Sequence, residues 1–362
     1  MRLTDLIPGL TLALFLSAEG AGQDTGTFAS RVVSLSEPGG YFDTDNLISN
    51  ERSYLHVAPE LEPLSRAAVR NGVYLGVGPD QNFSYIARLR PRMAILIDIR
   101  RDNLLLHLLF KALFERARNR VEYLSMLTGR EVPPAGTDWS SKPLDSIVAW
   151  VDRAPVLGAA QMARLRETLA QTIRGYGVRL EARDLETIDR FHGRFITAGL
   201  SLQFNSTGRA PRFSYPTYRD LLLEVDRQGQ KRSFVATESD FLFLKDLQAR
   251  HMVIPIVGDL SGPTALAGVG KLLTAQKQQV AAIYASNVEF YLFGEGTFPR
   301  WVANLRRLPL QPGSLIIRSV FPGGTGITPP PGYNCLSATQ SIQALLDGHA
   351  EGRFRRYAEL VR

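Results

Sequence analysis

The chain has 362 residues, of which 44% are hydrophobic and 21% are charged. This composition excludes a disordered or fibrous protein, and the length fits two domains or one large domain with insertions. The net charge is +7, and only 6 of the 42 basic residues are lysine. Guanidinium groups pair well with phosphate, but the basic residues are scattered, which favours an ordinary solvated surface and disfavours a nucleic-acid partner.

Cysteine and histidine content limits the chemistry further. The single cysteine, Cys335, excludes an internal disulfide framework and a multi-cysteine metal site. We expect it to be a small buried residue or an inert loop thiol. The five histidines are dispersed, and no HExxH, P-loop or serine-triad motif is present, so the sequence indicates no metal site.

Residues 1–22 have the order of a secretory signal. A basic start, Met1-Arg2, precedes an apolar run from Leu6 to Ala18, and small residues follow at Gly20 and Gly22. This order favours export to the periplasm or medium; the alternative is a cytoplasmic chain. The apolar run is too short to span a bilayer, so we expect no integral membrane segment in the mature chain. Residues 23–40 are polar and glycine-rich and are interpreted as a linker.

Residues 41–57 carry an unusual density of polar groups between apolar ones. They include Asp43, Asp45, Asn46, Asn50 and Glu51. Two interpretations stay open: these groups form a ligand-facing loop before the first strand, or they only cap turns. Residues 41–129 are predicted to form the first part of an α/β core.

Residues 73–98 form the most informative stretch. A short apolar run ends at Gly76-Val77-Gly78, a helical segment follows, and a second apolar run, Met93–Ile97, ends on Asp98. In a parallel βαβ unit, such glycines let the backbone approach a ligand, and the following helix offers free N–H groups. The acid lies 20 residues after Gly78, the usual separation for a carboxylate that accepts ribose hydroxyls. The stretch therefore predicts a nucleoside-containing ligand.

The segment from 130 to 250 has a different pattern. Helical stretches follow one another, and no strand of a parallel sheet is evident. We interpret this segment as a mainly helical insertion above the carboxyl ends of the strands, where open α/β sheets bind ligands. Four of its aromatic residues are candidates for the pocket wall: Phe204, Phe213, Tyr215 and Tyr218.

The second part of the core is predicted over residues 251–321. Apolar runs at 251–257, 280–285 and 314–320 alternate with helical segments, which predicts a doubly wound, mostly parallel sheet. The first of these runs leads to Asp259 and the second to Asn287. Residues 322–362 are predicted to form a glycine- and proline-rich loop followed by helices at 337–346 and 353–362.

The order of these motifs resembles the class I S-adenosylmethionine-dependent methyltransferase fold. The resemblance rests on YFDTDNLISNE, GVGPDQNFSYIA, DIRRDN, VGDLSGP and SNVEFYL, and it covers most of residues 31–320. The chain looks like an uncharacterised bacterial family in which a methyltransferase-like Rossmann core is split by a helical insertion. It differs from the usual pattern in having Pro79-Asp80-Gln81 after the second glycine, and it lacks an Asn-Pro-Pro-aromatic motif.

The resemblance implies a set of site residues and a small-molecule substrate of unknown identity. S-adenosylmethionine would contact Gly76, Gly78, Gln81, Asn82, Asp98 and Asp259. Methyl transfer depends mainly on positioning. Asn287, Glu289 and Asp80 would orient or deprotonate the acceptor.

Two other function classes remain open. S-adenosylmethionine is kept in the cytoplasm, so an exported chain could instead be a non-enzymatic binder of a nucleoside-like or other small molecule. An NAD-linked dehydrogenase is compatible with the Gly–Asp spacing, but the chain has no GxGxxG motif. The sequence does not specify the oligomeric state.

Overall fold

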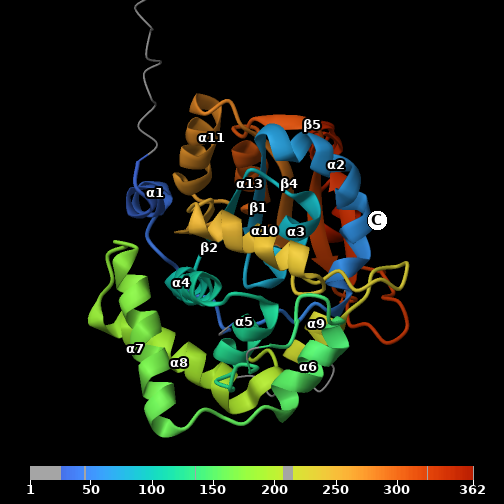
Figure 1. The fold of residues 1–362 in the computed structure, drawn as a ribbon. Coiled ribbons are helices and arrows are strands. Elements are labelled where there is room, and N and C mark those ends of the chain that lie inside the picture. The colour runs from blue at the N-terminus through green and yellow to red at the C-terminus, as the bar shows by residue number, and fades with distance from the viewer. Residues whose placement is uncertain (1–25, 45, 135, 207–214, 324, 362) are drawn as a thin grey trace, which may run out of the picture.

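A computed structural model describes residues 26–44, 46–134, 136–206, 215–323 and 325–361 (Figure 1). The protein is an α/β protein with a six-stranded, mostly parallel sheet in the order β3-β2-β1-β4-β5-β6. The strands are β1 (Gly72–Val77), β2 (Met93–Asp98), β3 (Val253–Val257), β4 (Gln279–Ser286), β5 (Leu310–Val320) and β6 (Leu336–Ser341). The first five strands run parallel, and β6 is antiparallel to β5.

Strands β1, β2 and β3 are almost entirely apolar because both of their faces are covered. Every residue of β1 and β3 is buried, as is all of β2 before Asp98. Such runs are typical of parallel sheets between two layers of helices. Asp98 pairs in register with Val257, so the ends of β2 and β3 lie side by side. The strand order reverses between β1 and β4, which are hydrogen-bonded neighbours.

Helices cover both faces of the sheet. On one face lie α2 (Ala58–Asn71), α3 (Gln81–Leu89), α4 (Arg101–Arg116) and α10 (Glu238–Ala249). In Figure 1, α3 and α10 are seen in front of the strands. The other face carries α11 (Ala265–Ala275) and α13 (Phe298–Leu305), which contact each other. Two further helices lie near the chain end, α14 (Ile342–Ala350) and α15 (Tyr357–Leu360), and α12 (Val288–Gly294) follows β4 directly.

The part of the chain between β2 and β3 that lies below the sheet in Figure 1 is mainly helical. Its helices are α5 (Arg120–Leu127), α6 (Leu144–Arg153), α7 (Ala159–Gly175), α8 (Ala182–Ala198) and α9 (Tyr218–Leu223). They contact the core through α4, which packs against α5, α7 and α8. Among its described residues this region contributes no strand to the sheet.

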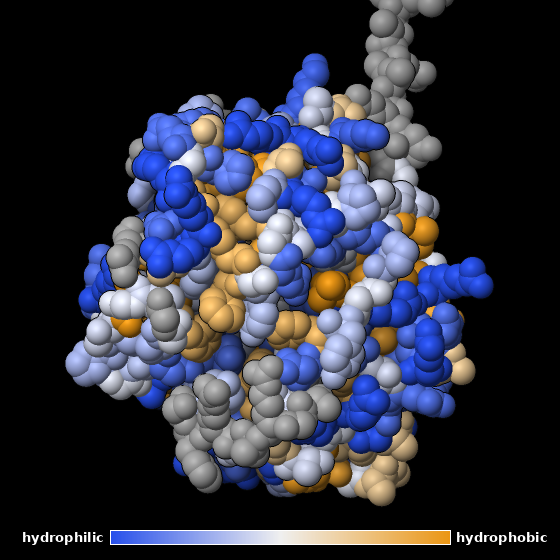
Figure 2. All heavy atoms as spheres, turned by 180° about the vertical axis from the view of Figure 1, so that it is seen from behind, coloured by the Kyte–Doolittle hydropathy of each residue, from blue (hydrophilic) through white to orange (hydrophobic). Residues whose placement is uncertain are grey.

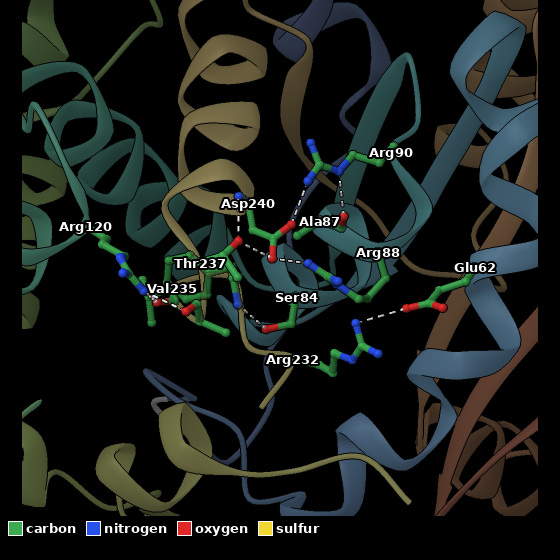
Figure 3. A network of polar contacts seen from close by, with 12 residues as sticks. Glu62, Ser84, Ala87, Arg88, Arg90, Arg120, Arg232, Val235, Thr237 and Asp240 are labelled. Atoms are coloured by element: carbon green, nitrogen blue, oxygen red, sulfur yellow. Dashed lines mark hydrogen bonds and ion pairs between the residues drawn. The ribbon is translucent and has the colours of Figure 1, made fainter. Parts of the chain in front are cut away.

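Buried ion pairs fix α10 against α3 (Figure 3). Asp240, near the start of α10, accepts hydrogen bonds from Thr237 Oγ1 at 2.8 Å and from Arg90 Nη2 at 2.6 Å, and it also pairs with Arg88. Arg90 is the left-handed residue that ends α3, with φ +53°. Two cations therefore compensate one buried carboxylate and hold the helix that follows the glycine turn.

Two predictions about secondary structure were wrong. The expected linker at 23–40 contains α1 (Phe28–Leu35), which packs on β3 through Phe28, Val32 and Leu35. The helix expected at 337–346 begins instead with β6, an edge strand; only its second part is helical. Edge strands need no apolar alternation, and β6 is mostly half-buried and polar, so its sequence gave no strand pattern.

The remaining predictions for the chain ends have different outcomes. The proposed signal at 1–22 lies outside the described residues. Among the described residues, no helix combines the length and the apolar character that a membrane span requires. At the other end of the chain, the helix expected at 353–362 is the short α15.

Candidate functional site

A cavity of about 740 Å³ lies at the carboxyl edge of the sheet. Its wall includes the ends of β1, β2, β3 and β4, part of the segment 41–51, and Phe204, Ser206 and Tyr215 from the helical region. Open α/β sheets bind ligands at this edge, at the point where the strand order reverses. A volume of this size is in the range of small-molecule and cofactor sites.

The turn after β1 reaches the cavity through Gly78. Its φ of +80° is a conformation that glycine adopts without strain. A Cβ placed on Gly78 would meet only the side-chain amide of Asn46, at 3.5 Å, so the backbone is open on the cavity side. His107 supports the turn, since its Nε2 lies 2.9 Å from the Gly78 carbonyl oxygen. Burial lowers the pKa of His107 to about 4, and the hydrogen bond to Gly78 only partly opposes this, so His107 is a neutral support for the turn.

Asp98 lines the cavity, but its carboxylate is already bound by Arg100. Oδ1 accepts from the Arg100 backbone N at 2.9 Å and from Nε at 3.0 Å, and Oδ2 accepts from Nη2 at 2.9 Å. A carboxylate has about four acceptor positions, so one position on Oδ2 remains. Arg100 was not recognised from the sequence, and it neutralises much of the charge of the predicted ribose acceptor.

Arg100 also positions the segment 41–51 over the cavity. Its Nη1 donates to the Thr44 carbonyl at 2.9 Å. Thr44 Oγ1 in turn donates to the Asn205 carbonyl at 2.8 Å, and Thr44 forms a β-bridge with Ser206. Of the two interpretations of this segment, the structure favours the loop that faces the site, because Asp43, Asn46, Asn50 and Glu51 line the cavity; Asp45 lies outside the described residues.

Asp259 lines the cavity next to the end of β3. Its Oδ1 accepts from the Ser261 backbone N at 2.7 Å and its Oδ2 from Ser261 Oγ at 3.1 Å, so the side chain also fixes its own turn. Its backbone N donates to Glu37 Oε1 at 2.8 Å. Glu37 Oε2 accepts from the backbone N of Ala265, at the start of α11, at 3.1 Å. Burial alone would raise the pKa of Glu37, but these hydrogen bonds outweigh it and lower that pKa.

Asn287 lines the cavity directly after β4. The preceding residue, Ser286, has φ +53°, a strained conformation for a residue with a side chain. Its hydroxyl lies 3.4 Å from Asn287 Oδ1 and also donates to Glu51. The chain therefore turns sharply where the strand ends, which brings the Asn287 side chain to the cavity.

Glu51 is the least expected residue of the site. It lines the cavity although the residue is only 2% exposed. Its carboxylate accepts hydrogen bonds from four uncharged side chains: Gln81, Tyr284, Ser286 and Ser319. Burial raises the pKa of Tyr284 well above its usual value, and the negative charge of Glu51 contributes to this. The sequence showed Glu51 only as one acid among several in a polar loop.

Four of the predicted site residues lie outside the cavity lining. Gly76 is inside β1, where a Cβ would clash with Asn82 Oδ1 at 1.9 Å. Asn82 is fully buried; its amide donates to the carbonyls of Val77 and Pro79 and thereby shapes the turn. These two residues are therefore structural parts of the turn, and we correct their expected contact with a cofactor.

Asp80 and Glu289, two of the three predicted catalytic residues, are also buried away from the lining. Asp80 accepts from Tyr218 Oη, and burial raises the pKa of Asp80 to about 7 although that hydrogen bond lowers it. Glu289 is fully buried in an ion pair with Arg318, whose Nε lies 2.7 Å from Oε2. Asp80 directly precedes α3 and Glu289 lies on α12, and both side chains face the interior. Their expected contact with an acceptor is therefore corrected. Of the three predicted catalytic residues, Asn287 lines the cavity.

Charge and aromatic rings characterise the described part of the lining. Its acidic residues are Asp43, Glu51, Asp98, Asp259 and Glu295, and its basic residue is Arg100. Aromatic side chains also line the cavity, including the pair Phe42–Tyr291 with ring centroids 5.1 Å apart and the pair Phe204–Tyr215 at 5.3 Å. Figure 2 shows the side of the molecule turned away in Figure 1, where hydrophobic residues gather in a band across the middle between hydrophilic areas. An acidic, aromatic-lined cavity suits a ligand with a planar group and a positive charge.

The predicted aromatic wall is confirmed in part. Phe204 and Tyr215 line the cavity, Phe213 lies outside the described residues, and Tyr218 is buried beneath the site. Cys335 is buried, as expected, and burial raises the pKa of its thiol to about 12. Across the described residues, no group of three or more His, Cys, Asp or Glu side chains is arranged to hold a metal ion.

The fold and the cavity define an α/β protein with a candidate small-molecule site at the carboxyl edge of its sheet. Residues 47–135 and 203–355 match the family described as a domain of unknown function, DUF7790. The chain belongs to this family. The matched segments include all six strands and leave out residues 136–202, which hold α6, α7 and α8. A comparison with curated proteins gave no match.

Proposed function

We propose that this chain binds S-adenosylmethionine in the cavity and is a methyltransferase-like protein that acts on a small molecule. The observation that carries the proposal is the convergence of Gly78, Asp98, Asp259 and Asn287 on one cavity. These residues follow four different strands and were selected from the sequence by their positions at strand ends. Their common location is what a nucleoside site at the switch point requires.

The charge of the lining supports a cationic cofactor over a dinucleotide. S-adenosylmethionine carries a sulfonium, an ammonium and a carboxylate group, with a net charge of about +1, whereas the two phosphates of oxidised NAD outweigh its nicotinamide cation and leave a net charge of about −1. The described lining has five carboxylates and one guanidinium, Arg100, which is already bound to Asp98. Like charges in a partly desolvated site repel, so a pyrophosphate would bind poorly here. The antiparallel β6 also departs from the two parallel halves of the dinucleotide-binding fold.

Calorimetric titration with S-adenosylmethionine, S-adenosylhomocysteine and NAD tests the proposal. We expect the first two to bind and NAD not to bind. Asp98→Ala should weaken binding at least roughly tenfold, about 1.4 kcal/mol, because the ribose acceptor is lost. Asp102→Ala, at the start of α4 and outside the cavity lining, is the matched control and should leave Kd unchanged. Equal binding of all three ligands, or of none, would contradict the proposal.

A second candidate is an exported protein that binds a nucleoside-like ligand without methyl transfer. It is favoured by the burial of Asp80 and Glu289, which leaves Asn287 as the lining residue among the three expected to assist the reaction. Sequencing the mature N-terminus of the native protein after cell fractionation distinguishes the two. Removal of residues 1–22 and a periplasmic location would favour the binding protein, and an intact cytoplasmic chain would favour the methyltransferase.

A further inference from the structure

The carboxylate of Glu51 has no positively charged partner among the described residues. Its nearest donors are the amide of Gln81 at 3.0 Å, the hydroxyl of Ser319 at 2.6 Å, and the hydroxyls of Tyr284 and Ser286. Neutral donors stabilise a buried carboxylate only in part, because its net charge remains in a poorly solvated place. Elsewhere in the described chain, buried acids such as Glu289 and Asp240 are paired with arginine. The open side of Glu51 is the cavity.

Glu51 has hydrogen-bond donors but no cation, whereas two other acceptor atoms of the lining residues have no donor among the described residues. Gln81 Oε1 and Asn334 Oδ1 are buried atoms without a hydrogen-bond partner among the described residues, and both side chains line the cavity. The orientation of Gln81 is fixed because its Nε2 donates to Glu51, and a carboxylate can only accept. Asn334 Nδ2 donates to the Asn50 carbonyl at 2.7 Å, which leaves its oxygen free on the other side. We call these three residues the acceptor cluster: Glu51, Gln81 and Asn334.

The acceptor cluster defines the missing partner by its chemistry. A group that satisfies it must carry a positive charge and must donate more than one hydrogen bond. A sulfonium or a quaternary ammonium group has the charge but no N–H donor, and an alcohol has a donor but no charge. A primary ammonium group has both, since it offers three N–H donors on a compact cation.

We propose that the acceptor cluster binds the ammonium group of a primary-amine substrate, so that the protein acts on an amine. This inference rests on the proposed function and narrows it to a substrate class. The position supports an acceptor amine, since Glu51 accepts a hydrogen bond from Ser286 Oγ, and Ser286 directly precedes the lining residue Asn287. An ammonium nitrogen has no lone pair, so the substrate would first have to give a proton to the Glu51 carboxylate before its nitrogen could accept a methyl group. Aromatic residues of the lining, among them Tyr291 and Phe290, would contact the rest of the substrate.

Three matched probes test the ammonium site: putrescine, its neutral counterpart 1,4-butanediol, and tetramethylammonium. Kd would be measured by ligand-detected NMR, with melting temperature as a second readout. We expect putrescine to bind and to raise the melting temperature. Butanediol and tetramethylammonium should each bind at least roughly tenfold more weakly, since one lacks the charge and the other lacks the N–H donors.

Substitutions in the acceptor cluster test whether this selectivity depends on it. Glu51→Gln keeps the shape of the side chain and removes its charge, and it should weaken putrescine at least roughly tenfold. Asn334→Ala removes one neutral acceptor in a loop and should weaken the binding of putrescine by a smaller factor, roughly fivefold. This variant tests the acceptor cluster even if Glu51→Gln does not fold. The control is Glu186→Gln, at an exposed position of α8, which should leave Kd unchanged.

A cofactor arm identifies the source of the ammonium group. S-adenosylhomocysteine has an ammonium group, and methylthioadenosine has the same nucleoside without one. If Glu51→Gln leaves both affinities unchanged and abolishes putrescine binding, the amine belongs to the substrate. If it weakens S-adenosylhomocysteine alone, the cluster serves the cofactor and the substrate assignment is overturned.

The remaining outcomes are also decisive. Failure of wild-type protein to bind putrescine, or equal binding by the Glu51→Gln variant, overturns the inference. Glu51-dependent binding of putrescine without any binding of S-adenosylmethionine would leave the amine site standing and would remove the proposed cofactor. The failure of the inference is thereby distinguished from the failure of the proposed function.

Discussion

Glu51 and Glu289 are buried glutamates that lie near the carboxyl ends of β4 and β5, yet their surroundings differ. Glu289 is packed between α12 and β5, where Arg318 Nε and Nη2 donate to its two oxygens at 2.7 and 3.2 Å. Trp301 Nε1 is a more distant donor to it, at 3.5 Å. Among the described residues, the donors to Glu51 are all uncharged, and Glu51 borders the cavity. The charge of Glu289 is thus compensated within the fold, while we propose that a ligand compensates the charge of Glu51.

This difference separates residues that maintain the structure from residues that serve a site. Removing one partner of a buried ion pair leaves an uncompensated charge and is costly. Removing a buried charge that has no partner stabilises the folded state, and proteins keep such charges where binding or chemistry needs them. Asp80 is a third case, because it is buried without a cationic partner in the described part of the chain and lies outside the cavity lining. We therefore expect a different change in stability when each of the three acids is substituted.

The largest effect is expected for Glu289→Ala. The variant leaves Arg318, whose side chain is 3% exposed, without its carboxylate and opens a small cavity beside Trp301. We expect the free energy of unfolding to fall by about 3–5 kcal/mol, as for other broken buried pairs. Urea unfolding followed by circular dichroism measures this loss.

The control for this variant is Glu351→Ala. Glu351 pairs with Arg353 on the surface, where the two side chains are 62% and 54% exposed. Such a pair is worth less than about 1 kcal/mol. If Glu289→Ala lost as little stability as Glu351→Ala, Glu289 would not be the structural ion-pair partner that distinguishes it from Glu51.

The next effect is a pH dependence that comes from Asp80. Burial raises its pKa from 3.8 to about 7, with the Tyr218 hydrogen bond opposing, so the folded protein holds a proton that the unfolded chain releases above pH 4. Stability therefore falls between about pH 4 and 7 and then levels off, by roughly 2–4 kcal/mol in total. Asp80→Asn lacks this loss, and its stability relative to wild type should rise over that pH range.

Urea unfolding of both proteins at several pH values checks this prediction. Asp138→Asn is the comparison, because hydrogen bonds from Ser140 and Ser141 lower the pKa of the exposed Asp138. That group stabilises the fold above its usual pKa, so its variant should be slightly less stable than wild type at neutral pH and equal to it in acid. A stability difference for Asp80→Asn that stays constant with pH would refute the assignment.

The smallest change in stability is expected for Glu51→Gln. Three of the four donors to Glu51 are hydroxyl or phenol groups, which can reverse their direction to accept from an amide. The free energy of unfolding should stay within about 1 kcal/mol of wild type or increase, because an uncompensated buried charge is removed. A loss as large as that of Glu289→Ala would show that Glu51 is a structural residue.

The sequence predicted the core of the fold because the central strands are continuous apolar runs. Strands β1 and β3 are buried throughout and are followed by glycine, whereas β2 and β4 end on Asp98 and Ser286. The positions of Gly78, Asp98, Asp259 and Asn287 followed directly, since strand ends of a parallel sheet meet at one edge. The same rule could not show where Asp80 and Glu289 point.

The rest depended on contacts between distant residues. Arg100 lies two residues from Asp98, but its bidentate contact with that carboxylate is one of several conformations that the local sequence allows. Glu51 meets Ser319 across 268 residues. A helix such as α1 was missed because it has only eight residues and is stabilised by packing on β3. These features arise from tertiary structure and leave no local signal.

The contact made by Glu37 has a practical consequence for studies of this family. Glu37 lies outside the residues that match DUF7790, yet it accepts hydrogen bonds from the backbone N–H groups of Asp259, Thr264 and Ala265. A shortened protein that begins at residue 47 would lose these bonds and α1 together. Expression trials of the domain should therefore start upstream of Phe28, because a shorter product would lose the hydrogen bonds that hold the Asp259 loop at the cavity.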